Sequence, residues 1–184
     1  MKWGWLMASA ILPAGPLMAA DHSPFDGIPG IRFEYYEVEG RTPREIYQSM
    51  EASAPRGGEG LAQTIWGIDV NWHEATHGSV CRVRDPRTRL SIRVVLPKLR
   101  QDEEPTRAGL AFWRATRKGL EIHEAGHARI AWDHRDDFNQ AALSASCRSI
   151  DRVAREIQAK IAALQEAYDR DTDHGRRQTP GSGD

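Results

Sequence analysis

The stretch TRAGLAFWRATRKGLEIHEAGHARIAWDH, residues 106–134, carries the strongest structural signal in the chain. Its apolar and histidine positions recur mostly every three or four residues, which is the period of an amphipathic α-helix. The recurring positions are Trp113, Thr116, Leu120, His123, His127, Ile130, His134, Phe138 and Ala141. The pattern therefore predicts one long helix over residues 106–141.

A second helical pattern follows after the periodicity resets around residues 144–146. Ser146 is a candidate N-cap for this helix. A short connection between the two helices implies an antiparallel hairpin. If the hairpin turns near Ala145, residue 125 of the first helix lies level with about residue 165 of the second. The apolar stripe of the second helix is Ile150, Val153, Ile157, Ile161, Leu164 and Tyr168.

Upstream of this hairpin, the pattern is typical of a small sheet. Residues 32–39 are rich in aromatic and β-favouring side chains, which indicates a strand. Thr42 and Glu45 form a capping box with Pro43 at the first helical position, so a short helix follows and ends by Pro55. Alternation over residues 64–72 and 80–96, with a candidate turn at Asp85, predicts antiparallel strands. The expected fold class is α+β: a small antiparallel sheet with one short helix, then a long antiparallel helical hairpin.

His123, Glu124 and His127 form an H-E-x-x-H motif on the first helix of that hairpin. Side chains four residues apart on a helix lie about 5–6 Å apart at Cβ, so two imidazoles can bind one ion at roughly 2.0–2.1 Å. Glu124 is placed to take a proton from a water on that ion. The motif predicts a zinc (Zn²⁺) site with His123 and His127 as ligands and Glu124 as the general base.

The segment His73-Glu74-Ala75-Thr76-His77 satisfies the same expression. It continues an alternating strand and runs directly into Gly78. In an extended chain its two histidines would stand about 13 Å apart, too far to share an ion. We interpret this second copy as a decoy.

The third protein ligand is open from the residues alone. On a continuous helix, His134 lies about 16 Å along the axis from His123, which excludes it. The second helix passes the motif near residues 164–169, so Asp169 could bind from the helix end, or His174 could fold back from the segment that follows. We favour His174, and the competing interpretation of this stretch is a frayed, charged terminus.

The first twenty residues have a lysine, an apolar run and small residues before Asp21, which is typical of a secretory signal peptide. We expect a periplasmic or secreted protein, with retention of the segment as an N-terminal anchor as the alternative. In an oxidising compartment Cys81 and Cys147 are expected to pair. Residues 21–175 then form one domain, and residues 176–184 a disordered tail.

Composition excludes some partners. The chain has 184 residues, with 25 Lys and Arg against 26 Asp and Glu, for a formal net charge of -1. Bulk electrostatics therefore gives no support for a nucleic-acid partner or an anionic-membrane partner. No segment after the signal peptide approaches the roughly 18 apolar residues of a membrane span. Both helices are committed to an internal core, so a monomer is expected.

Several features together resemble a bacterial family of unknown function whose members are described as predicted secreted zinc-dependent proteases. The resemblance implies zinc binding and peptidase activity, and its histidine–glycine ending adds weight to His174 as a ligand. It rests on residues 35–42, Trp66, Trp72, Cys81-Arg82-Val83, His123 to His127 with Ile130, Cys147, Tyr168-Asp169, Thr172, His174 and Gly175.

The function expected from the sequence is an exported zinc metallopeptidase that hydrolyses peptide bonds of a protein or peptide substrate. Two alternatives stay open. One is a non-catalytic cell-envelope protein that zinc stabilises. The other is an interaction module whose helical hairpin binds a partner, with His123 and His127 simply hydrogen-bonded in the core.

Overall fold

The structure is a computed structural model that describes residues 22–56, 60–100, 102 and 104–178. The expected signal peptide, residues 1–20, lies outside the described residues, as does the end of the expected tail from residue 179. Among the residues that are described, no helix is long and apolar enough to cross a membrane.

Three strands form one sheet with the order β1-β3-β2. They are β1 (Ile31–Val38), β2 (Gln63–His77) and β3 (Val80–Leu99). β2 and β3 form a long antiparallel hairpin, but β1 pairs with β3 in parallel, so the expectation of a wholly antiparallel sheet is wrong. Helix α1 (Pro43–Ser53) lies between β1 and β2 in the chain, and β3 inserts between them in space. The alternation of apolar and polar residues shows which face of the sheet a residue occupies, but it does not show which strand pairs with it.

β3 runs without interruption through Asp85 and Pro86, where the sequence indicated a turn. Asn71 pairs with Arg87 and His73 with Arg84, so both Asp85 and Pro86 lie opposite the one residue Trp72. This is a β-bulge, and Asp85 has a φ of 47° there. The second H-E-x-x-H segment is the extended end of β2, which confirms that it is no helical metal motif.

Two helices replace the single helix expected over residues 106–141. They are α2 (Arg107–Asp133) and α3 (Asp137–Ala142). His134 ends α2, and its Nδ1 donates to the Asp137 carboxylate at 2.9 Å, while Lys160 Nζ donates to the same oxygen at 2.8 Å. Phe138 and Ala142 stay buried beyond this turn, so the apolar period continues across it. Periodicity alone therefore could not show the break.

Helix α4 (Ile150–Thr172) runs back along α3 and α2, and a short 3-10 helix, η1 (Arg176–Gln178), follows it. Its N-cap is Ser149 and not Ser146. The expected capping box of α1 is confirmed, with Thr42 and Glu45. At the start of α2, the Thr106 hydroxyl accepts from the Gly109 N–H. η1 occupies the first three residues of the segment that was expected to be a tail.

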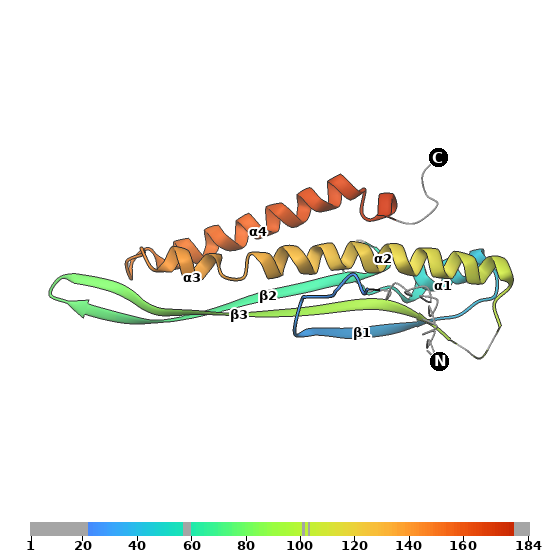
Figure 1. The fold of residues 1–184 in the computed structure, drawn as a ribbon, viewed down its shortest axis with the longest axis horizontal. Coiled ribbons are helices and arrows are strands. Elements are labelled where there is room, and N and C mark those ends of the chain that lie inside the picture. The colour runs from blue at the N-terminus through green and yellow to red at the C-terminus, as the bar shows by residue number, and fades with distance from the viewer. Residues whose placement is uncertain (1–21, 57–59, 101, 103, 179–184) are drawn as a thin grey trace, which may run out of the picture.

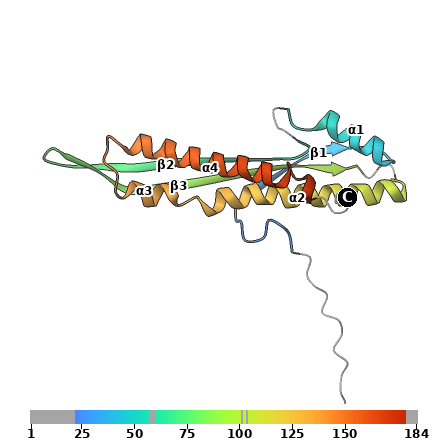
Figure 2. The ribbon, with the colours of Figure 1, turned by 90° about the horizontal axis from the view of Figure 1, so that it is seen from above.

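The three later helices lie on one face of the β2–β3 hairpin, and α4 runs alongside α2 above the sheet (Figures 1 and 2). One core cluster joins α2 to the middle of the sheet through Val94, Leu96 and Ala128. A second joins α3 and the start of α4 to the outer part of the hairpin through Val83 and Phe138. The fold is therefore α+β. Helix α4 is stacked above α2, the helix that carries the H-E-x-x-H motif.

A disulfide links Cys81, near the start of β3, to Cys147, in the connection between α3 and α4. The two Cα atoms are 5.6 Å apart, and the Cys147 N–H donates to the Cys81 carbonyl at 3.4 Å. The pairing expected from the sequence is confirmed. It ties the far end of the hairpin to the turn from which α4 begins.

Candidate metal centre

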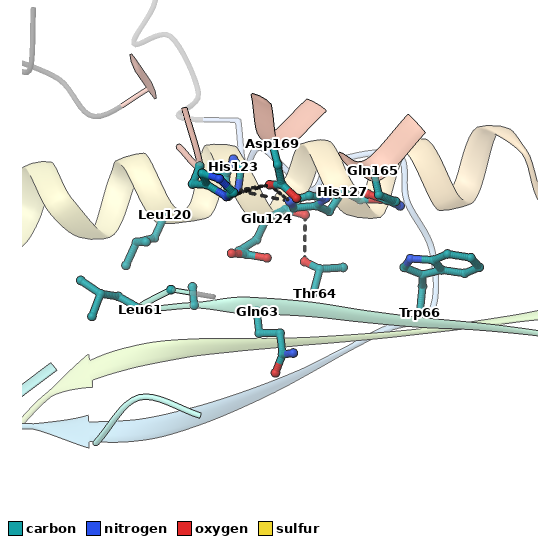
Figure 3. Close-up of a pocket in the computed structure, with 13 residues that line it drawn as sticks. Leu61, Gln63, Thr64, Trp66, Leu120, His123, Glu124, His127, Gln165 and Asp169 are labelled. Atoms are coloured by element: carbon teal, nitrogen blue, oxygen red, sulfur yellow. Dashed lines mark hydrogen bonds and ion pairs between the residues drawn. The ribbon is translucent and has the colours of Figure 1, made fainter. Parts of the chain in front are cut away.

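Two imidazoles and one carboxylate converge between α2 and α4 (Figure 3). His123 Nε2 lies 3.2 Å and His127 Nε2 3.0 Å from Asp169 Oδ1, and the two Nε2 atoms are 3.1 Å apart. Tetrahedral ligands at about 2.0 Å from one zinc ion stand about 3.3 Å from one another. The three atoms therefore already have the spacing of a zinc ligand set.

Gln165 on α4 determines which nitrogen of His127 carries a proton. Its side-chain Nε2 donates to the His127 backbone carbonyl at 3.1 Å, so its Oε1 is the atom that faces His127 Nδ1, at 2.5 Å. A carbonyl oxygen only accepts, and Nδ1 must therefore be the donor. In the neutral ring, Nε2 then presents its lone pair to Asp169 and His123.

Gln178 on η1 has the same relation to His123. Its Oε1 lies 3.1 Å from His123 Nδ1, while its Nε2 donates to the Tyr168 hydroxyl at 2.8 Å. Burial, followed by the neighbouring His127, lowers the pKa of His123, which favours the neutral ring. Three lone pairs thus point at one spot, and a divalent cation satisfies all of them. The residues fit a metal ion.

Tyr168 on α4 packs across both histidines. Its ring stacks on His123 with centroids 5.2 Å apart and meets the His127 ring edge to face at 5.0 Å. A Cβ on Gly126 would collide with the Tyr168 phenol, and one on Gly175 would stand 2.9 Å from His123 Cγ. Both glycines are therefore required by close approach, and Gly175 also has a φ of 82°.

Glu124 lies on the strand side of this cluster (Figure 3). It is only 3% exposed, and its Oε2 has no hydrogen-bond partner among the described residues. Burial raises its pKa to about 7. Thr64 on β2 donates its hydroxyl to the Glu124 backbone carbonyl at 3.0 Å and so holds α2 against the strand. A buried carboxyl group with an unpartnered oxygen can exchange protons near neutral pH.

A cavity of about 230 Å³ opens beside these groups. Its walls come from β2 and the residues before it, from α2, and from α4 with the segment that follows it. The lining side chains that surround the cluster are Leu61, Gln63, Thr64, Trp66, Leu120, Glu124, Gln165 and His174. Glu124 and the three convergent residues therefore share one solvent-connected space.

Asp169, the open alternative from the sequence, is the residue that the structure brings to the two histidines. His174, the expected third ligand, lines the cavity beside them, with Nδ1 3.9 Å from Asp169 Oδ1. The chain turns after Thr172 because Asp173 and His174 both adopt left-handed conformations, with φ near 50°. That turn carries His174 past the position that Asp169 occupies.

Two residues of the site, Gln165 and Gln178, are not part of any motif that the sequence shows. Gln165 lies four residues before Asp169, so helical spacing from Asp169 could have found it. Gln178 gave no signal, because it falls in the segment that was expected to be a disordered tail. Its contact with His123 depends on the turn at residues 173–175.

Comparison with known proteins identifies the family. Residues 33–175 match the family model described as "Bacterial protein of unknown function (DUF922)", and the chain belongs to this family. The matched range begins in β1 and ends at Gly175, so it contains the whole convergent triad. Searches of curated proteins and of solved structures found no match.

We predict that Gly126→Ala destabilises the fold by at least about 2 kcal/mol, since its new methyl group overlaps the Tyr168 ring. Alanine favours a helix by about 1 kcal/mol over glycine, so intrinsic propensity has the opposite sign. Denaturant unfolding of Gly126→Ala, Tyr168→Leu and the double variant checks this. A penalty that persists unchanged in the Tyr168→Leu background would rule out the clash.

The raised pKa of Glu124 predicts a pH effect on the stability of the metal-free protein. The unfolded state loses this proton near pH 4.5 and the folded state near pH 7. The folded state thus binds more protons in this window, and its stability falls as pH rises from about 4.5 to about 7. Unfolding of chelator-treated protein should show this fall, and Glu124→Gln should weaken it. An identical pH profile in both proteins would contradict the assignment.

Proposed function

We propose that this chain is a zinc-dependent peptidase in which His123, His127 and Asp169 hold the metal and Glu124 is the general base. The observation that carries the proposal is the convergence of three lone pairs at 3.0–3.2 Å, with both rings oriented by glutamine side chains. Asp169 replaces His174 as the third ligand because its carboxylate meets both Nε2 atoms.

The donor set supports zinc over other divalent ions. Two imidazole nitrogens and one carboxylate oxygen form a mixed N and O set that suits zinc, whereas calcium and magnesium take oxygen ligands. Three protein ligands leave a fourth position open, which is the pattern of catalytic zinc sites. Structural zinc sites are usually closed by four protein ligands, most often with cysteine. Both cysteines of this chain are in the disulfide.

When bound, zinc supplies Lewis acidity, which polarises a substrate carbonyl and lowers the pKa of a coordinated water. Glu124 takes one proton from the attacking water as its oxygen adds to the carbonyl carbon. It then gives that proton to the amide nitrogen as the C–N bond breaks, so one carboxyl group serves as base and then as acid. A pKa near neutrality suits both roles.

The cavity supports a peptide as substrate. Leu61, Leu120 and Trp66 supply apolar wall, and the Gln63 side chain lies on the neighbouring strand (Figure 3). His174 is half exposed at the same cavity and is free to contact a bound substrate. We also infer export to the periplasm or the medium, which the Cys81–Cys147 disulfide supports because such bonds persist in oxidising compartments.

A non-catalytic role for zinc remains the second candidate. One observation favours it: the three ligand atoms come from α2 and α4, so an ion there would cross-link these two helices. In that case zinc would stabilise the fold and Glu124 would be dispensable. The two experiments that follow separate this candidate from the peptidase.

For metal content, we expect about one zinc per chain by mass spectrometry, with loss of the ion in His123→Ala and Asp169→Ala. His174→Ala should retain it, because His174 stands outside the triad. The matched control is His73→Ala with His77→Ala, which removes the second motif and should leave zinc content unchanged. Zinc that survives in Asp169→Ala but not in His174→Ala would restore His174 as the ligand.

For catalysis, Glu124→Gln should bind zinc like the wild type and lose about 10²–10⁴-fold in hydrolysis of a fluorescence-quenched peptide library. The amide keeps the shape of the side chain but cannot accept the proton. Activity equal to the wild type would remove Glu124 from the mechanism. A wild-type protein that holds one zinc and cleaves no peptide would support the non-catalytic role.

A further inference from the structure

The helix-free face of the β2–β3 hairpin carries a row of arginines. Alternate residues of β3, such as Val83, Ile92 and Val94, are buried beneath the helices. Figure 1 shows α2, α3 and α4 on that one side of the hairpin, while the other side is uncovered along its outer part. Most of the outward positions of β3 are occupied by arginine: Arg82, Arg84, Arg87, Arg89 and Arg93, with Ser91 between the last two.

The β-bulge keeps these arginines on one face. Arg84 is paired with His73 and Arg87 with Asn71. Asn71 and His73 are two residues apart on β2, so they share a face, and their partners share it as well. In a regular strand, Arg84 and Arg87 would point to opposite faces because they are three residues apart. The β-bulge at Asp85 and Pro86 absorbs one residue of that spacing, so both arginines lie on the same face. Successive charges along each half of the row are about 6.8 Å apart.

Most of this positive charge is not neutralised within the chain. Arg93 pairs with Glu34 at 3.0 Å. The other four, which we call the arginine row, are exposed, and their side chains form no hydrogen bond or ion pair with any residue that the structure describes: Arg82, Arg84, Arg87 and Arg89. Of the β2 residues that pair with the row, only Asp69 is acidic, opposite Arg89. A chain of net charge -1 thus has one face with a local excess of positive charge.

The chemistry of the face selects the partner. Arginine binds phosphate groups with two parallel hydrogen bonds, so the row favours a phosphate-bearing partner. Single-stranded nucleic acid also needs aromatic platforms for its bases. No Phe, Tyr or Trp occupies an outward position of the hairpin between Ile65 and His77 on β2 or between Val80 and Arg93 on β3. A planar array of phosphates can meet the whole row at once, because no helix or strand of the described residues overhangs it.

We propose that the arginine row docks this protein on an anionic phospholipid surface. Clusters of four or more basic residues are sufficient for such binding when a second membrane signal is present. Retention of the apolar N-terminal run as an anchor, which is the alternative to its cleavage as a signal peptide, would supply that second signal. The candidate metal centre lies on the helix side of the sheet, so docking through the row leaves its cavity open. This inference does not depend on peptidase activity.

The test compares two charge-matched variants of the full chain. One replaces the arginine row: Arg82→Gln, Arg84→Gln, Arg87→Gln and Arg89→Gln. The control replaces four other exposed arginines: Arg44→Gln, Arg107→Gln, Arg114→Gln and Arg148→Gln. Flotation with phosphatidylglycerol vesicles should show at least a tenfold loss of binding for the row variant only. Binding to phosphatidylcholine vesicles, which includes any effect of the N-terminal run, should be equal in all three proteins.

Three results would overturn the proposal. Equal loss in both variants would show that net charge acts, and not the row. Unchanged binding in the row variant would show that the face is not the docking surface. Tighter binding of the wild type to an oligonucleotide than to phosphatidylglycerol vesicles, lost in the row variant, would assign the face to nucleic acid. Zinc content and far-UV circular dichroism of each variant confirm that the fold is intact.

Discussion

The packing of Tyr168 on Gly126 sets the distance between α4 and α2, and the candidate centre depends on it. With no side chain at residue 126, the phenol ring reaches both histidine rings. Asp169, the next residue along α4, then meets both Nε2 atoms. A larger residue at position 126 would push the helices apart and separate the carboxylate from the imidazoles.

The opposite end of α4 is held by a different set of bonds. The disulfide ties residue 147 to β3, and Lys160 joins α4 to Asp137 beside the break between α2 and α3. The carboxylate at 137 also accepts from His134, so the break is part of the same anchor. Helix α4 is thus attached at three points: beside its start to β3, in its middle to α3, and at its end to the two histidines of α2. Those attachments set the register in which Gln165 and Asp169 face α2.

The sheet divides the molecule into two electrostatic environments. On the helix side, burial raises the pKa of Glu124 and lowers the pKa of His123, which favours the forms that exchange a proton and bind a cation. On the other side, strand residues are solvated, and arginines remain charged without partners. The β-bulge at Asp85 and Pro86 maintains this division, because it preserves the alternation of faces along β3. The one extra residue of the bulge therefore keeps the core residues on the helix side and the arginine row on the other side.

The sequence by itself determined the helical motif, the α1 capping box, the extended state of the second H-E-x-x-H segment and the Cys81–Cys147 pair. These features depend on local spacing, on local hydrogen bonds or on the presence of just two cysteines, which can form only one pair. Only the tertiary structure decided the parallel pairing of β1, the break after Asp133 and the contacts that Asp169, Gln165 and Gln178 make with the two histidines. Paired strands are separated by tens of residues in the chain, and so are the residues that meet at the candidate metal centre. No local sequence period therefore encodes these contacts. The turn at residues 173–175, built from three successive residues with positive φ, takes His174 past the triad and brings Gln178 to His123.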